Sequence, residues 1–181
     1  MKRGLKLELV VTAPAWNEIT DAPPRRHIRR AALAALDTAA APPNVSLSVM
    51  LAGRQRLRAL NREFRNTDLS TDILAFPAAA PRDLKDDRDS AVFIGDLALS
   101  HEELRKTAGQ FNASPCEQLA HLIVHGVLHL LGHDHDIPAR ARRMRRLESE
   151  ALARLSLPDP WTADARRSLQ HQSEIRTQAL Q

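Results

Sequence analysis

Sulfur and aromatic residues are scarce in this chain. Cysteine occurs once, at Cys116, which rules out an internal disulfide and any cysteine-rich zinc finger. Tyrosine is absent and aromatic residues make up 3% of the sequence, so we do not expect the stacking platforms with which sequence-reading RNA modules bind bases. Cys116 itself is predicted to be a small buried hydrophobic residue.

Long apolar runs are also missing. The first three residues, Met1 to Arg3, include two basic side chains, but charged residues interrupt the leucines between Leu5 and Leu9, so no signal-peptide core follows. No run approaches the ~18 apolar residues that would indicate a membrane span. We therefore expect a cytoplasmic protein that does not bind a membrane.

Apolar and charged residues are present in ordinary amounts. With 43% apolar and 27% charged residues in 181, the composition predicts a soluble domain with a hydrophobic core. The net charge is +4, and arginines gather at residues 25–30 and again at Arg142, Arg143, Arg145 and Arg146. Clustered arginine favours a polyanion such as nucleic acid, although a solvated helix face explains either cluster alone equally well.

The hydrophobic pattern predicts strands in the first half and helices afterwards. Alternation of apolar and polar residues indicates strands at 5–12, 45–51, 72–76 and 91–99, with a bulge at Gly95. Helices are predicted at 25–39 and 54–64 and again beyond Ser100, while the segment 78–90 is predicted to be an exposed loop. This order is typical of an α+β domain with a mostly antiparallel or mixed sheet.

Two serines can begin the helices of the second half. Ser100 and Ser114 are each followed three residues later by a glutamate, which is the capping-box pattern. Pro158-Asp159-Pro160 then closes a single domain at 1–160, and the polar segment 161–181 is expected to be a tail.

One stretch carries the pattern of a catalytic metal site. His125 and His129 are four residues apart, so on a helix both imidazoles lie on one face and can reach one ion. Gly132 allows the helix to stop, and His135 can return from beyond the turn as a third ligand. Three nitrogen ligands with an open fourth position are typical of catalytic zinc, although imidazole also suits nickel. We predict one zinc ion per chain.

The neighbouring histidines and carboxylates are less suitable as ligands of that ion. His121 lies on the same helix face, but eight residues of helix rise about 12 Å, which is too far for His121 and His129 to share an ion. We expect His121 to pack behind the ligands, while His133 could compete as a ligand. Three carboxylates could orient a ligand histidine or cap a turn: Asp72, Asp96 and Asp134.

The same histidine spacing occurs in the metzincin proteases, whose pattern is H-E-x-x-H-x-x-G-x-x-H. Gly126 stands here where those proteases carry their glutamate base. Peptide hydrolysis needs a base that deprotonates the metal-bound water and passes the proton to the amine leaving group. A protease is therefore disfavoured.

The residues from His125 to His135, His-Gly-Val-Leu-His-Leu-Leu-Gly-His-Asp-His, resemble the motif H-G-x-L-H-L-x-G-Y-D-H of the YbeY family of bacterial endoribonucleases. His133 replaces the usual tyrosine. Three further segments resemble parts of the family: Leu60-Asn61 with Phe64-Arg65, Thr71–Pro77 (T-D/N-V-L-S-F-P, with Ala75 for serine) and Ile94–Ser100 (G-D-I-x-I-S). The resemblance covers about residues 45 to 160.

The resemblance implies an α+β fold with a four-stranded mixed sheet, about five helices and a zinc site at the end of a core helix. It implies a zinc-dependent, single-strand-directed endoribonuclease that processes precursor ribosomal RNA, including the 3′ end of 16S RNA, and serves ribosome quality control. Arg65 is implied to line the site and to act with His125 in catalysis, because a guanidinium can hold a phosphate bidentately. The four arginines from Arg142 to Arg146 are candidate RNA-binding residues.

The partners implied are ribosomal RNA and the small ribosomal subunit, bound by a monomer. The alternative is a non-catalytic ribosome assembly factor in which zinc only pins the turn at Gly132. A structural zinc of that kind would have a fourth protein ligand, with His133 or Asp134 as the candidate.

Overall fold

The computed structural model describes residues 3–78 and 91–161; most of the loop predicted at 78–90 and nearly all of the predicted tail lie outside these ranges. In chain order the elements are β1 (Gly4–Val11), a 3-10 helix η1 (Pro14–Glu18), α1 (Pro24–Thr38), β2 (Asn44–Ala52), α2 (Arg54–Arg65), β3 (Ile73–Pro77), β4 (Val92–Ser100), α3 (His101–Gln110), α4 (Pro115–Leu130) and α5 (Pro138–Arg154). Within the described ranges, no helix combines the length and apolar character needed to cross a bilayer.

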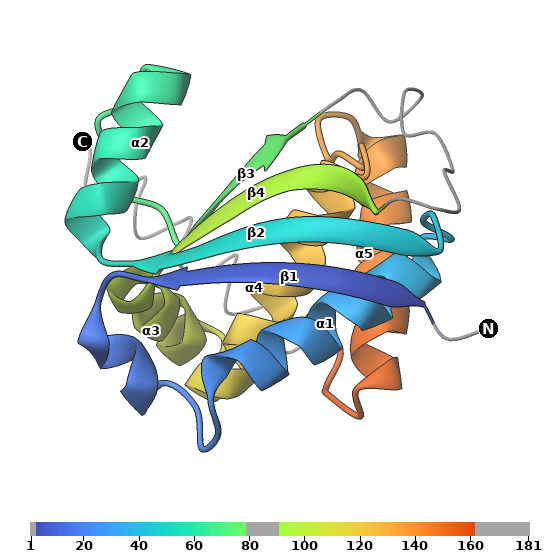
Figure 1. Ribbon diagram of the computed structural model, residues 1–181, viewed down its shortest axis with the longest axis horizontal. Helices are drawn as coiled ribbons and strands as arrows, with labels where there is room; N and C mark the ends of the chain where they lie inside the picture. Colours follow the sequence, from blue (N-terminus) through green and yellow to red (C-terminus); the bar gives the residue numbers. More distant parts are fainter. Residues whose placement is uncertain (1–2, 79–90, 162–181) are drawn as a thin grey trace.

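The four strands form one mixed sheet in the order β1-β2-β4-β3. β1, β2 and β4 are parallel, and β3 runs antiparallel to β4 at one edge (Figure 1). The predicted bulge is present: pairing with β2 passes from Phe93 to Gly95, and Gly95 has φ 134°. A Cβ at Gly95 would collide with the carbonyl oxygen of Phe76, so only glycine fits there. The α+β fold with a mixed sheet is therefore confirmed.

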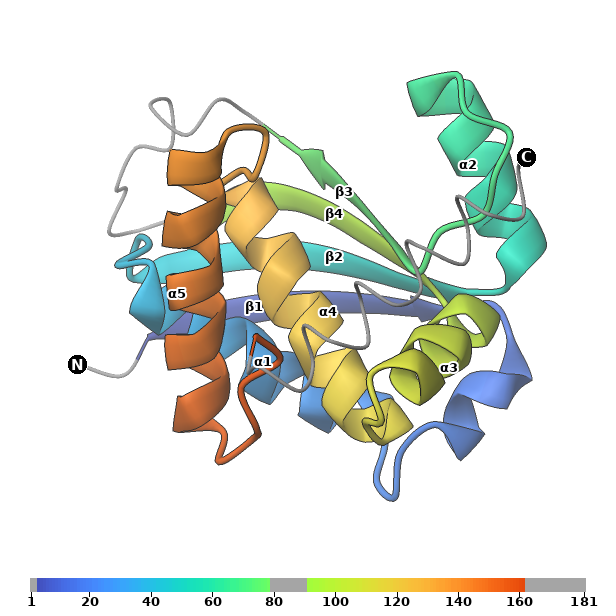
Figure 2. The same ribbon diagram turned by 180° about the vertical axis from the view of Figure 1, so that it is seen from behind.

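One face of the sheet is covered by helices. Figure 2 shows α4 lying across this face, with α1 and α5 beside it. α4 contacts α1, α3, α5 and the strands β3 and β4, and it contributes a run of fully buried side chains such as Ile123, Val124 and Val127. It is the core helix of the domain, and its position is fixed from several sides. The side chains on the last two turns of α4 are therefore held on a rigid element.

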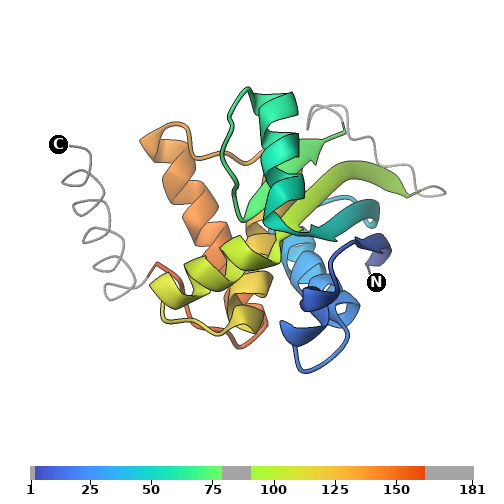
Figure 3. The same ribbon diagram turned by 90° about the vertical axis from the view of Figure 1, so that its left-hand side faces the viewer.

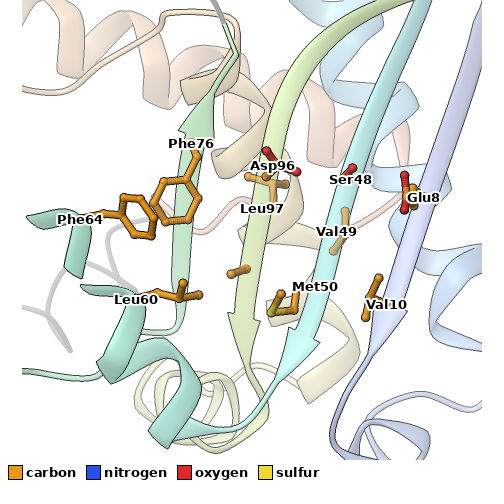
Figure 4. Close-up of a pocket in the computed structure, with 11 residues that line it drawn as sticks. Glu8, Val10, Ser48, Val49, Met50, Leu60, Phe64, Phe76, Asp96 and Leu97 are labelled. Carbon is orange, nitrogen blue, oxygen red and sulfur yellow. The ribbon is translucent and has the colours of Figure 1, made fainter. Parts of the chain in front are cut away.

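Within the described ranges, the other face of the sheet is covered at one end, by α2 (Figure 3). Leu57 and Leu60 of α2 pack with Leu74 and Ala98 in a small second cluster. Beside it lies a pocket of about 430 Å³, where the ring of Phe64 meets that of Phe76 edge to face at 5.2 Å (Figure 4). The lining side chains come from all four strands and from α2.

Two features of the N-terminal part were not predicted from the sequence. η1 places Trp16 in the core, where its indole N–H donates to the Ala52 carbonyl at 2.8 Å. Arg25 and Arg29 of α1 donate to the carbonyls of Leu7 and Leu5 on the edge strand β1, both at 2.6 Å. Two members of the first arginine cluster therefore cover a sheet edge.

Candidate metal centre

α4 begins and ends as its sequence indicates. Ser114 and Glu117 form a reciprocal capping box at its start. At the other end Gly132 adopts φ 83°, a left-handed conformation that favours glycine, and the chain reverses there. The reversal brings residues 133–137 back past the end of the helix. His135 is thereby carried to the side of α4 that holds His125 and His129.

The structure brings the three predicted ligands together. One nitrogen from each of His125, His129 and His135 lies within 4.8 Å of the others. The Nε2 atoms of His125 and His129 are 3.1 Å apart, and the His135 ring lies 5.6 Å and 5.1 Å from those of His125 and His129. Among the described residues these three are a group able to hold a metal ion.

The donor atoms fit a tetrahedral ion. Nδ1 of His125 lies 2.6 Å from a carboxylate oxygen of Glu148, which holds the proton on Nδ1 and leaves the Nε2 lone pair facing His129. Two ligand nitrogens at zinc–nitrogen distances of about 2.0–2.1 Å with tetrahedral angles are about 3.3 Å apart. The observed separation of 3.1 Å is close to that edge. The residues present therefore suit zinc.

Glu148 of α5 is the functional residue that the sequence interpretation missed. Its side chain is 1% exposed, and its other oxygen accepts from the indole N–H of Trp161 at 2.7 Å. Burial by itself raises the pKa of this carboxyl. The hydrogen bond from His125, the charges of His121 and His125 and the hydrogen bond from Trp161 have the opposite effect. Together they outweigh burial, so the pKa is lowered. The sequence offers one signal: Glu148 is an acid that lies next to Leu147 among the apolar positions of α5.

His129 is held in the neutral form that a ligand requires. Burial, followed by the neighbouring His125 and His135, lowers its pKa to about 4. His121 lies outside the group of three, as predicted. Its Nε2 is buried and lies 3.9 Å from a carboxylate oxygen of Glu148, and its ring packs edge to face against that of Trp161. Burial lowers the pKa of His121.

The residues after Gly132 support the turn. Asp134 accepts from the backbone N–H of His135 at 2.7 Å and lies 4.0 Å from Nδ1 of His129, so it both shapes the loop and faces a ligand ring. His133 is not in the group of three; burial and the charge of Arg143 lower its pKa.

The two remaining carboxylates lie elsewhere. Asp72 caps the start of β3, where it accepts from the backbone N–H of Ile73 at 2.9 Å. Asp96 lines the pocket on the opposite face of the sheet (Figure 4).

Arg65 lies at the outer edge of β3. It ends α2, and its guanidinium donates a long hydrogen bond of 3.5 Å to the Ala75 carbonyl. Ala75 and Ile73 pack into the main core on the α4 side, whereas Leu74 belongs to the cluster under α2. Arg65 therefore lies beside the edge strand β3, whose side chains alternate between the two faces of the sheet. Its hydrogen bond is to this strand and not to a histidine.

The remaining residues singled out from the sequence are the arginines of α5 and Cys116. All four arginines from Arg142 to Arg146 are exposed, and Arg145 lies over the Trp161 ring at 4.8 Å. The prediction that Cys116 is buried is wrong. It is the second residue of α4, where the helix reaches the surface, so it is partly exposed, and its Sγ lies 3.2 Å from Nδ1 of His27.

Comparison with known proteins gives one consistent result. The family model described as Endoribonuclease YbeY matches residues 13–156. A protein named Endoribonuclease YbeY from Bradyrhizobium sp. is 38% identical over 155 residues, which are 85% of this chain and 90% of the relative. One of the same name from Chloroflexus aurantiacus is 39% identical over 137 residues, or 72% and 86%.

A solved structure shares the fold. The solution structure of a Thermotoga maritima protein matches with a TM-score of 0.52 and 18% identity, and the match covers 86% of this chain and 99% of that one.

Proposed function

This chain belongs to the YbeY family of endoribonucleases, and we propose that it cleaves RNA with a zinc ion held by His125, His129 and His135. The observation that carries the proposal is the convergence of three imidazoles within 4.8 Å, one of them fixed by a buried carboxylate. The substrate is precursor ribosomal RNA, including the 3′ end of 16S RNA, and the role extends to ribosome quality control.

The charge of the site favours an anionic substrate. Three neutral imidazoles leave the double positive charge of an ion uncompensated, which suits a phosphodiester better than a neutral amide. When bound, the ion supplies Lewis acidity toward a phosphoryl oxygen and lowers the pKa of water. Glu148 orients His125, and the proposed role of Arg65 is to hold charge that develops on the phosphate as the bond breaks.

Position 126 supports a nuclease over a peptidase. A Cβ at Gly126 would lie 2.7 Å from both Ile73 and Leu97, so a side chain there points into the sheet. The place that the metzincin base occupies in sequence is therefore unsuited to a catalytic carboxylate in this fold. We expect no metal-dependent cleavage of unfolded protein substrates.

The proposal includes the partners implied by the family. The chain acts as a cytoplasmic monomer on ribosomal RNA and the small ribosomal subunit, through one domain at 1–160. The alternative, an assembly factor with a structural zinc, needs a fourth protein ligand. The described residues supply three, which supports an open coordination position.

Single-turnover cleavage of structured RNA tests the proposal, with Arg65→Ala compared with Arg62→Ala. Both arginines lie in the last turn of α2, so the pair separates a specific role from loss of one positive charge. Loss of an electrostatic donor to the transition state costs about a hundred- to a thousandfold in rate. Arg65→Ala should show this loss with unchanged metal content, and Arg62→Ala should cleave like the parent.

Three outcomes would contradict different parts of the proposal. Equal cleavage by Arg65→Ala and the parent at saturating enzyme removes Arg65 from the mechanism. Cleavage that survives in His129→Ala, after elemental analysis has shown that its zinc is lost, contradicts metal dependence itself. Stoichiometric zinc in His129→Ala would instead show that the ligand set is wrong.

A further inference from the structure

A second group of potential ligands lies at the opposite end of α4 from the histidine cluster. Cys116 is in the first turn of α4, His27 is in the first turns of α1, and Asp21 lies in the segment before α1. A sulfur, a ring nitrogen and a carboxylate oxygen from these residues lie within 4.8 Å of one another. Neither the nuclease chemistry nor the family motif uses any of the three.

The His27 ring is close to both of the other groups. Its Nδ1 is 3.2 Å from Sγ of Cys116, and its Nε2 is 3.3 Å from a carboxylate oxygen of Asp21. Nε2 is shielded from solvent, yet it makes no hydrogen bond within the described part of the chain, because the nearby Asp21 oxygen is not aligned for one. Such an unsatisfied buried nitrogen beside a carboxylate is unfavourable unless another group binds it.

The Sγ–Nδ1 contact of 3.2 Å has the length of a hydrogen bond, and the nitrogen–oxygen contact is the one that suits a shared cation. The nitrogen–oxygen separation of 3.3 Å is close to the edge of a tetrahedron built on zinc–nitrogen and zinc–oxygen bonds of about 2.0–2.2 Å. A thiolate, an imidazole and a carboxylate form a donor set of intermediate softness, which selects zinc-like ions over calcium or magnesium. The side chains of Cys116 and His27 are partly exposed, so an ion has access.

We propose that Asp21, His27 and Cys116 bind a second divalent cation of the zinc class, which joins the start of α1 to the start of α4. An ion takes one nitrogen of the His27 ring, the Cys116 thiol releases its proton to solvent on binding, and water completes the coordination. Burial and the carboxylates of Asp21 and Glu117 raise the pKa of the free thiol, and Arg30 opposes them, so protons compete with the ion.

The test uses the full-length, metal-free chain and cobalt(II) as the probe. Cys116 is the only cysteine in the chain. A thiolate-to-cobalt charge-transfer band therefore reports this site and not the three-histidine cluster. The parent should bind two cobalt ions per chain and show the band. Cys116→Ser should bind one without it, and His27→Asn should lose it, whereas His129→Ala should keep it.

Alkylation of Cys116 gives a readout independent of colour. At zinc concentrations about ten times the dissociation constant, mass action predicts that alkylation of the parent slows about tenfold. His27→Asn should show little protection. Absence of the charge-transfer band in the parent, or an equal cobalt titration of the band in the parent and His27→Asn, would overturn the proposal. RNA cleavage is not part of either measurement, so failure here leaves the nuclease proposal standing.

Discussion

At the scale of single residues, the buried carboxylate of Glu148 decides how well the site is prepared for a cation. A fully buried acid is costly unless charge and hydrogen bonds compensate it, and Glu148 is bonded on both oxygens, to His125 and to Trp161. The lowered pKa keeps it ionised. An ionised carboxylate behind a ligand imidazole fixes the tautomer and makes the other nitrogen a better donor to the metal.

Glu148→Gln is expected to weaken zinc binding by about ten- to a hundredfold, because glutamine keeps the volume but not the negative charge. Glu150→Gln is the matched control: it lies one half-turn away on α5, is about half exposed and faces Arg146 at 3.7 Å. Competition with a chromophoric chelator measures both affinities. If the two variants bind zinc equally, Glu148 only fills space behind His125.

At the scale of secondary-structure elements, the position of α4 depends on Gly126. The helix approaches β3 and β4 so closely there that a methyl group would meet Ile73 and both methyls of Leu97. Glycine in a helix interior costs about 1 kcal/mol relative to alanine, so its presence needs a packing reason. The close approach supplies one.

Two glycine-to-alanine variants should therefore shift stability in opposite directions. Gly126→Ala gains helix propensity but forces Leu97 to move within a packed core, and we expect a net loss of about 1 kcal/mol. Gly109→Ala in α3 meets open space, so it should gain up to about 1 kcal/mol. Urea unfolding of both metal-free variants measures the difference, and stabilisation by Gly126→Ala would show that the contact relaxes freely.

Features set by local sequence could be predicted, whereas those that depend on packing between helices could not. The spacing of His125 and His129 fixes their geometry within one helix, and Gly132 fixes the reversal, so these positions could be predicted locally. Strands and helices with clear periodicity were predicted to within a few residues. η1 was missed because five residues are too few for a periodic signal. Glu148 was missed because its contact arises only when α5 packs on α4.

At the scale of the whole molecule, the end of the domain is held by Trp161. Asp159 accepts from Ser149 at 2.8 Å and from the Trp161 backbone, and this places the indole between His121 and Arg145. The sequence boundary at residue 160 assigns Trp161 to the tail. Its contacts give it a structural role instead, while the dispensability of the residues beyond it remains a proposal.

Two shortened chains test that proposal. A chain ending at Asp164 keeps Trp161 and should melt within a few degrees of the full-length protein. A chain ending at Pro160 loses the donor to the buried Glu148 carboxylate, which costs about 2 kcal/mol and corresponds to about 4–8 °C in a domain of this size. Melting curves in chelator exclude a contribution from metal. Equal melting of the two shortened chains would mean that Trp161 contributes nothing to stability.

The distribution of positive charge over the molecule leads to the last prediction. Arg25 and Arg29 of α1 are bonded to the edge of the sheet, whereas the side chains of Arg142 and Arg143 on α5 are exposed and extend from the helix that carries Glu148. Phosphate contacts release counterions, so each contact adds about 0.7 to the slope of log affinity against log salt for single-stranded RNA. If α5 binds RNA through these arginines, their removal should therefore reduce the salt dependence of binding by a predictable amount.

Arg142→Gln with Arg143→Gln should lower that slope by about 1.4, two contacts at about 0.7 each, and weaken RNA binding most at low salt. The control, Arg26→Gln with Arg30→Gln, removes the same charge from the exposed side of α1 and should change the slope much less. Binding of one structured RNA is measured across a salt series with metal-free protein, so that cleavage does not intervene. An equal fall in slope for both pairs would show that RNA is attracted by net charge alone, and α5 would then lose its place in the interface.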